Sequence, residues 1–358
     1  MIPVTQPYLP PRKALDRYID GVYERRWLTN NGPLVRELES RLADYLGVDN
    51  LVLVANGTLA LQVAFRLLGV QGEAITTPFT FAATSSAMRW QGIQPRYADI
   101  DSQDFNLDPE LARARITPDT SAIVPVHVYG NPCRTQAFHD IGKQHGLPII
   151  YDAAHAFGVE SPDGASILNA GDISTLSFHA TKLFHTVEGG ALIIRDPELY
   201  EQARRLINFG FDSDSDIVDI GINAKMSEMN AAMGLATLDC VDDIIAKRAA
   251  LVEGYRKILD GHVGFQQRRG SENGAYMPIL LDSSEQTAIA LQALYDAGVH
   301  ARRYFAPALH ETPIFNSDDT CPVASDVVRR VLCLPLYQEL TIAEVRIICD
   351  TLIDVLKG

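Results

Sequence analysis

The sequence predicts an α/β protein with two domains, a large one built on a mostly parallel sheet and a small α+β one at the C-terminus. Its 358 residues exceed what a single hydrophobic core usually serves. Over the first two-thirds of the chain, short apolar runs alternate with helical patterns, as in parallel sheets covered by helices. This alternation ends near residue 240. We therefore predict a large domain over residues 1–240 and a small domain over residues 241–358.

The expected elements of the large domain are strands followed by helices. Short continuous apolar runs predict strands, because a strand that is buried on both faces has no polar side. These runs are Leu51–Ala55, Ala74–Thr77, Ala122–Val126, Pro148–Tyr151, Ile173–Phe178 and Ala191–Ile194. The helical patterns between them are Leu59–Leu68, Thr84–Trp90 and Thr135–Gln144. Ligands of such sheets bind at the carboxyl ends of the strands.

The small domain begins with a long helical pattern rich in Ala, Lys and Arg, Asp242–Leu259. Strands are expected at Ala275–Leu281 and Val331–Leu334, with helices at Gln286–Ala297 and Ile342–Leu356. Strands mixed with helices over this length are typical of a compact α+β unit.

Composition and charge exclude several classes of protein. Hydrophobic residues make up 47% and charged residues 21%, which is typical of a soluble globular chain. A net charge of −14 argues against general affinity for nucleic acids or anionic membranes. The five cysteines show no paired spacing, the first residues lack a signal peptide, and no apolar run approaches ~18 residues. We therefore expect a cytoplasmic protein without a membrane partner.

Lys182 is the first candidate for chemistry. It follows the predicted strand Ile173–Phe178 and precedes the glycine turn Gly189-Gly190. A lysine held at a strand end beneath apolar neighbours loses solvation, which lowers its pKa and makes its amine a nucleophile toward a carbonyl. The alternative is an ordinary exposed lysine, as most lysines are.

The segment Asn56-Gly57-Thr58 lies between a predicted strand and a predicted helix. Glycine permits close approach of the backbone, the threonine hydroxyl donates, and a helix N-terminus offers free N–H groups. Together these features outline a phosphate site. An ordinary helix cap is the alternative. Neither of the common glycine-rich nucleotide motifs, GxxxxGK[ST] and GxGxxG, is present.

Asp152 and Phe81 extend this set. A carboxylate at the end of a central strand is poorly solvated and needs a cationic or N–H partner, such as a protonated ring nitrogen, although Asp152 could also cap a turn. Phe81 could stack on a flat cofactor, although such an aromatic is more often part of the core. The histidines lack the spacing of a zinc site, so we expect no metal. A lysine, an aspartate, a phosphate site and an aromatic face are together what pyridoxal 5′-phosphate requires.

The chain resembles the sugar aminotransferases of the DegT/DnrJ/EryC1/StrS family, which have the aspartate aminotransferase fold (fold type I). The resemblance extends over nearly the whole length, and the joint order of its motifs is specific. The matching segments are Trp27–Pro33, Asn56–Leu61, Pro78–Thr84, His127–Gly130, Asp152–Gly158, Ser177–Lys182 and Gly221–Glu228. Two departures are Val187, where the family usually has glycine, and the neighbours Ile222, Ala224 and Lys225 of the family asparagine.

The resemblance implies a role for each candidate residue. Lys182 would bond covalently to pyridoxal phosphate, and Asp152 would pair with the ring nitrogen. Gly57, Thr58 and Ser177 would hold the phosphate.

Other residues would contact the ring, the partner subunit or the substrate. Phe81 and His155 would flank the ring. Asn223 would reach across the interface of a homodimer to the partner's phosphate. Thr29 and Tyr304 lie in segments that line the substrate cleft of relatives.

The family also implies the reaction. Its members transfer an amino group from L-glutamate, through pyridoxamine 5′-phosphate, to a nucleotide-linked keto-sugar. The segments Ile2–Pro7 and Trp27–Pro33 are most similar to the branch that makes dTDP-4-amino-4,6-dideoxyglucose from dTDP-4-keto-6-deoxyglucose for O-antigen or related glycans. The alternatives are a GDP-linked sugar, the opposite stereochemistry at carbon 4, or a non-catalytic protein that binds the cofactor. Family members that are dehydratases have histidine at the lysine position, so Lys182 argues against that activity.

Overall fold

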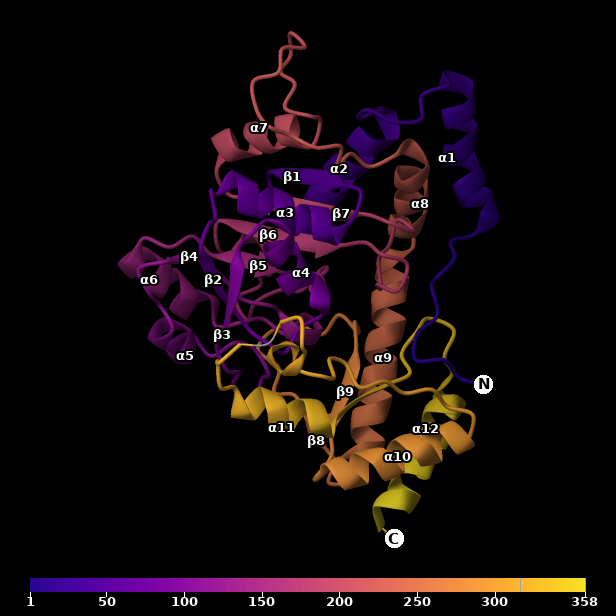
Figure 1. Ribbon diagram of the computed structural model, residues 1–358. Helices are drawn as coiled ribbons and strands as arrows, with labels where there is room; N and C mark the ends of the chain where they lie inside the picture. The colour runs from indigo at the N-terminus through magenta and orange to yellow at the C-terminus, as the bar shows by residue number, and fades with distance from the viewer. Residues whose placement is uncertain (316, 358) are drawn as a thin grey trace.

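The computed structural model describes residues 1–315 and 317–357. A large sheet lies in the upper lobe of the molecule in Figure 1, with strands in the order β3-β2-β4-β5-β6-β7-β1. The bridges Ile123–Ile149 and Val126–Asp152 join its two parts between β4 and β5. The strands are β1 Leu51–Val54, β2 Glu73–Thr76, β3 Gln94–Tyr97, β4 Thr120–Val124, β5 Ile150–Asp152, β6 Ile173–Ser177 and β7 Gly190–Ile194.

Both faces of this sheet are covered by helices. In β1, Val52 and Val54 pack into one apolar cluster with α3 and α4, whereas Leu51 and Leu53 pack into a second cluster with α2 and α8. This alternation follows from the two-residue period of a strand. Strand β7 runs antiparallel to its neighbours β1 and β6, so the sheet is mostly but not entirely parallel. The helices of this lobe are α1 Arg12–Arg25, α2 Pro33–Leu46, α3 Gly57–Leu67, α4 Ala82–Trp90, α5 Pro109–Ala114, α6 Thr135–His145, α7 Pro197–Leu206 and α8 Glu228–Leu238.

The lower lobe has a core of its own. Helix α9 descends from the large lobe, and its later turns pack with a small antiparallel sheet in the order β10-β9-β8 (Figure 1). Helices α10 and α12 pack against the same core. The elements are α9 Val241–Leu259, β8 Gly264–Phe265, β9 Met277–Leu280, α10 Ser284–Asp296, α11 Pro322–Arg330, β10 Val331–Leu334 and α12 Ile342–Lys357. Helix α9 begins at the first residue of the predicted small domain, and the division into domains stays a prediction.

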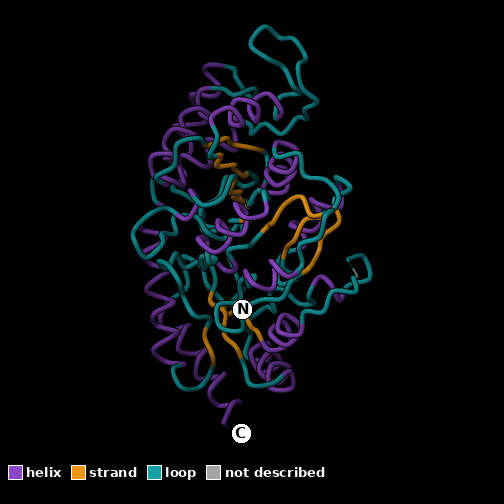
Figure 2. Tube along the Cα trace, turned by 90° about the vertical axis from the view of Figure 1, so that its left-hand side faces the viewer, coloured by secondary structure: helices purple, strands orange, loops and turns teal. Residues whose placement is uncertain are grey.

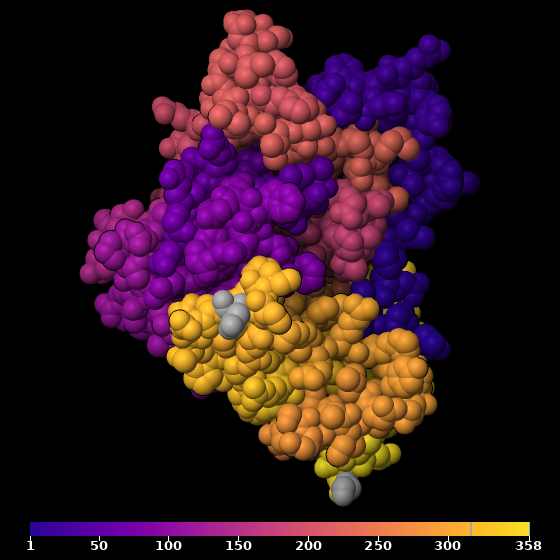
Figure 3. All heavy atoms as spheres, viewed as in Figure 1, coloured from indigo at the N-terminus to yellow at the C-terminus, as the bar shows by residue number. Residues whose placement is uncertain are grey.

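The first residues of the chain lie against the small lobe. Ile2 forms a parallel bridge with Val299, and the Leu336 amide donates to the Val4 carbonyl at 3.1 Å. Figure 3 shows this indigo segment running down one edge of the molecule onto the orange and yellow residues. The amino-terminal segment, which precedes the large sheet in the sequence, is therefore attached to the small lobe, which is formed by the last residues of the chain.

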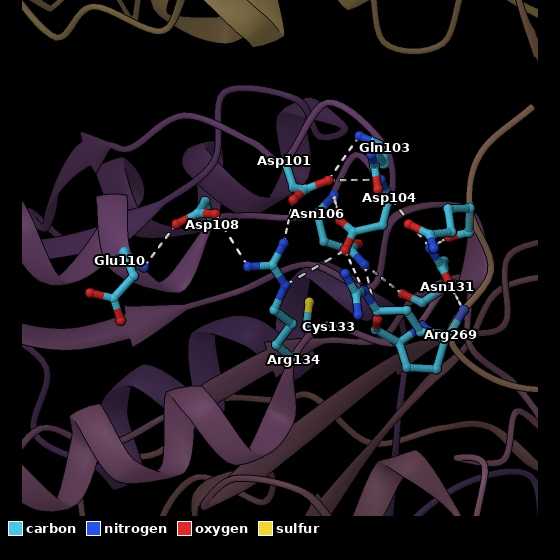
Figure 4. A network of polar contacts seen from close by, with 12 residues as sticks. Asp101, Gln103, Asp104, Asn106, Asp108, Glu110, Asn131, Cys133, Arg134 and Arg269 are labelled. Atoms are coloured by element: carbon cyan, nitrogen blue, oxygen red, sulfur yellow. Dashed lines mark hydrogen bonds and ion pairs between the residues drawn. The ribbon is translucent and has the colours of Figure 1, made fainter. Parts of the chain in front are cut away.

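A buried polar network connects the large lobe to the segment before β9 (Figure 4). Asp104, 1% exposed, pairs with Arg269 and accepts from the Asn106 amide at 2.9 Å. Arg134 lies 3.9 Å from the same carboxylate and also pairs with Asp101. The two lobes are thus joined by ion pairs and hydrogen bonds as well as by apolar contacts.

The predicted α/β architecture and its mostly parallel sheet agree with this structure. The sequence patterns did not predict strands β3 and β8 or helices α1, α2, α5, α7, α8 and α11. Strand β3 is short and contains Pro95 and Arg96, which hid it in the sequence pattern. The loop between α7 and α8 projects from the large lobe (Figure 2). Over residues 1–315 and 317–357, no helix combines the length and apolar character that a membrane span requires.

Candidate active site

A cavity of about 330 Å³ lies where the parallel strands of the large sheet end. Asp152 ends β5, Ser177 ends β6, and Asn56 follows β1 shortly after its last residue, so three strands bring polar groups to one place. The small lobe contributes the opposite wall. The lining includes Gly57, Thr58, Phe81, Asp152, His155, Ser177, His179, Lys182, Glu188, Tyr276, Arg302, Tyr304 and Phe305.

Lys182 lies in the turn after β6, where its amide donates to the His179 carbonyl at 2.9 Å. The residue is half-buried, and its amine is desolvated by the cavity walls. This burial lowers the pKa of Lys182 to about 8, although the Asp152 carboxylate acts in the opposite direction. About a tenth of the amine is therefore unprotonated at pH 7, far more than for an ordinary lysine, and this form is the one that a nucleophile or general base requires.

Asp152 is 6% exposed, and two donors fix its carboxylate. Thr84 Oγ1 donates to Oδ2 at 2.7 Å, and the Ala154 amide donates to Oδ1 at 3.2 Å. Burial nevertheless raises the pKa of Asp152, although these bonds and Lys182 lower it. The carboxylate thus lacks enough positive charge around it, and a protonated ring nitrogen would supply that charge.

The N-terminus of α3 forms one end of the cavity. Asn56 caps the helix, with Oδ1 accepting from the Leu59 amide at 2.9 Å. The amides of Gly57 and Thr58 precede the first bond within the helix and face a site for an anion. A Cβ atom at Gly57 would lie 2.9 Å from Ser177 Cβ, so only glycine allows this close packing of helix and strand.

Two rings border the middle of the cavity. Phe81 is 60% exposed and precedes α4, whereas His155 is 6% exposed and stacks on Phe305 with ring centroids 5.7 Å apart. Burial lowers the pKa of His155 well below its usual value, so the imidazole is neutral. Its Nδ1 atom has no hydrogen-bond partner within the described part of the chain. An orphaned polar atom, a desolvated amine, a buried carboxylate and a helix N-terminus together fit pyridoxal phosphate.

Thr29 and Asn223 do not line this cavity. Thr29 lies in the exposed loop before α2, and Asn223 is exposed and pairs with Asn208 across an isolated bridge. The other predicted site residues all line the cavity. Thr29 and Asn223 are the two that one copy of the chain does not bring there.

Several residues that line or support the site were missed by the sequence analysis. Thr84 holds Asp152, and Tyr276 and Arg302 come from the small lobe. Arg302 Nη1 lies 3.3 Å from the Tyr304 hydroxyl, and no carboxylate of the described residues lies within ion-pair distance of its guanidinium. The signal available was the run Arg302-Arg303-Tyr304, in which two cations precede a residue already expected in the cleft.

Comparisons with known proteins show which proteins the chain is similar to. The model of the DegT/DnrJ/EryC1/StrS aminotransferase family matches residues 12–353. A dTDP-4-amino-4,6-dideoxy-D-glucose transaminase of Shigella dysenteriae is 42% identical over 347 residues, which cover 94% of both chains. A protein of the same name from Escherichia coli is 39% identical over 350 residues, covering 95% of this chain and 94% of its own.

The fold has close solved counterparts. A crystal structure of DesI in the presence of its TDP-sugar product superposes with a TM-score of 0.94 at 37% identity. The superposition covers 99% of this chain and 93% of the DesI chain. The predicted fold class is thereby confirmed.

Proposed function

Because this chain belongs to the DegT/DnrJ/EryC1/StrS aminotransferase family, we propose that it transfers the amino group of L-glutamate to carbon 4 of dTDP-4-keto-6-deoxyglucose. The observation that carries the reaction type is the cavity that places Lys182, with its pKa of about 8, near the buried Asp152. The acceptor rests on similarity to the Shigella and Escherichia coli transaminases over almost the whole chain. The product would be dTDP-4-amino-4,6-dideoxyglucose, for O-antigen or related glycans.

Each residue of the site would have its own role in the reaction. Pyridoxal phosphate, when bound, supplies an electron-withdrawing ring that stabilises negative charge on the carbon that loses its proton. Asp152, fixed by Thr84, would keep the ring nitrogen protonated. Lys182 Nζ would act as the base that takes the proton from the amino donor and as the acid that returns it, in an overall 1,3 transfer. The amides of Gly57 and Thr58 would bind the phosphate, and Ser177 would donate its hydroxyl.

A homodimer with shared sites is part of this proposal. Asn223 and Thr29 lie outside the cavity of their own chain, and apolar side chains are exposed close to Asn223 in the sequence. Ile220 is 79% exposed and Ile222 is 42% exposed. A second copy seated on this surface would bury them and could bring Asn223 to the partner's phosphate.

The test begins with protein loaded with pyridoxal phosphate. Wild type should absorb at the edge of the visible range, L-glutamate should bleach this band, and Lys182→Ala should lose both the band and turnover. Wild type and glutamate are then incubated with dTDP- and GDP-linked 4-keto-6-deoxyhexoses, and NMR of the product gives the nucleotide, carbon and stereochemistry.

Two outcomes contradict the proposal. An unchanged spectrum in Lys182→Ala would remove the role of the lysine. Amination of the GDP sugar alone, or the opposite configuration at carbon 4, would replace the acceptor but keep the reaction type.

A further inference from the structure

Glu188 lines the active-site cavity but has no part in the chemistry described above. It lies six residues after Lys182, in the turn that leads into β7. Its side chain is 58% exposed, and its only ionic partner within the described residues is His179. No hydrogen bond from the described part of the chain reaches either carboxylate oxygen, so an acceptor group is available at the cavity wall.

The backbone of this turn is held firmly. Thr186 Oγ1 donates to the Glu188 carbonyl at 2.8 Å, and Asn230 Nδ2 donates to the Thr186 carbonyl at 2.7 Å. The Val187 amide donates to His185 Nδ1 at 3.3 Å. These bonds fix the residues on both sides of the position from which the Glu188 side chain projects.

Val187, next to Glu188, has a backbone conformation that is unfavourable in free energy. Its φ is +69°, a left-handed conformation that is unfavourable for a β-branched side chain by about 1–2 kcal/mol. Such backbone strain persists where the surrounding structure imposes it, and it concentrates at functional sites. The bonds to Thr186 and His185 supply that constraint here.

His179 lies beside the carboxylate without a hydrogen bond to it. The Thr181 amide donates to His179 Nδ1 at 3.2 Å, which holds the ring in place, and Nε2 lies 3.7 Å from Glu188 Oε1, beyond hydrogen-bond distance. Both carboxylate oxygens of Glu188 therefore remain available to a ligand.

We infer that Glu188 accepts a hydrogen bond from a ring hydroxyl of the acceptor sugar and thereby selects a hexose. This inference rests on the proposed function and names a residue that recognises its substrate. A carboxylate only accepts hydrogen bonds when ionised and repels the carboxylates of glutamate and the diphosphate of the nucleotide. On the acceptor sugar, the ring hydroxyls are donors of the kind that a carboxylate binds, and the cationic Arg302 lies on the small-lobe wall of the same cavity.

The test separates the sugar from the nucleotide. Calorimetry measures the binding of dTDP and of dTDP-4-keto-6-deoxyglucose to the holoenzyme without an amino donor, so that no turnover occurs. Glu188→Gln should weaken binding of the keto-sugar about 10-fold and Glu188→Ala up to about 100-fold, as loss of a bond to a charged group predicts. Affinity for dTDP should stay within twofold in both variants.

The matched control is Glu201→Gln, which removes the same charge from an exposed position on α7. It should leave the affinities for both ligands unchanged. Bleaching by glutamate should be as fast or faster in Glu188→Gln, because a repulsive charge has gone.

The outcomes distinguish this inference from the proposed function. If wild type binds and aminates the keto-sugar but Glu188→Ala binds it equally well, the inference is wrong and the function stands. Equal weakening for dTDP and the keto-sugar would also overturn it, because the effect would then not concern the hexose. If wild type neither binds nor aminates any dTDP-linked keto-sugar, the proposed function itself fails.

Discussion

Lys182 owes its reactivity to a balance between burial and charge. Desolvation disfavours the ammonium ion, whereas the Asp152 carboxylate favours it, and the result is a pKa of about 8 instead of 10.5. Asp152 shows the reverse, since burial raises its pKa. Each of the two charged groups therefore reduces the pKa shift that burial causes in the other. Removing one should move the pKa of its neighbour further from the usual value.

This balance predicts how the stability of the cofactor-free protein depends on pH. The pKa of Lys182 is lower in the folded chain, so the unfolded chain binds more protons between pH 8 and 10.5, and stability rises with pH across this window. The penalty below pH 8 is up to about 3 kcal/mol, reduced by the partial exposure of the residue. The substitution Lys182→Met should abolish this penalty, because methionine carries no charge.

Urea denaturation of both proteins at pH 7 and pH 10 measures the effect. Lys182→Met should be more stable than wild type at pH 7, and the difference should narrow as the pH rises. The exposed Lys247→Met on α9 corrects for the loss of one positive charge. A difference that is constant over this range would show that burial does not penalise the charge of Lys182.

At the scale of elements, Glu228 anchors the loop of residues 27–32, and its amide donates to the Leu28 carbonyl at 3.0 Å. The Glu228 carboxylate is fully buried and accepts from the Leu34 and Val35 amides at 3.0 and 2.9 Å, capping α2 from the start of α8. Gly32 has no side chain because a Cβ atom there would lie 2.5 Å from the carboxyl carbon. The loop that carries Thr29 is thus anchored by a residue almost two hundred positions later.

Removal of this cap should be costly. Glu228→Ala leaves two amides without an acceptor in the core and should lower the unfolding free energy by about 3 kcal/mol. Glu228→Gln keeps one acceptor oxygen and should lose about half as much. Chemical denaturation at fixed protein concentration measures both. Equal stability of Glu228→Ala and wild type would contradict the capping role.

Local patterns in the sequence predict much of the fold and the site, whereas contacts between distant residues leave no such pattern. Continuous apolar runs predicted most strands of the large sheet, and motifs at strand ends predicted Lys182 and Asp152 in one cavity. Thr84 and Tyr276 were missed because only tertiary structure brings them to Asp152 and to the cavity. Val187 was noted as unusual, but its left-handed backbone could not be predicted, because it depends on a turn held by Thr186 and His185 and joined through Thr186 to the distant Asn230.

At the scale of the whole molecule, Asp104 is the centre of the network that joins the lobes (Figure 4). Its carboxylate is buried between two arginines, and the segment that carries Arg269 leads into the small lobe. Burial raises the pKa of Asp104, and its hydrogen bond from Arg269 lowers it. Removing the carboxylate would leave both guanidinium groups without this partner.

Asp104→Ala should therefore lower the unfolding free energy by about 3 kcal/mol. The control is Asp326→Ala, whose exposed pair with Arg330 should contribute less than about 1 kcal/mol. Protein concentration is kept constant, since assembly would also stabilise the folded state. Equal losses in the two variants would show that the network does not stabilise the contact between the lobes.

The bridge between Ile2 and Val299 can form only after Val299 has been synthesised. A ribosome adds roughly 5–20 residues per second, so the first residues wait on the order of 15–60 s before their partner emerges. During that interval the large sheet can form, while the amino-terminal segment remains available to chaperones, proteases or a neighbouring nascent chain. A bulky amino-terminal fusion would therefore disturb the last step of folding rather than the first.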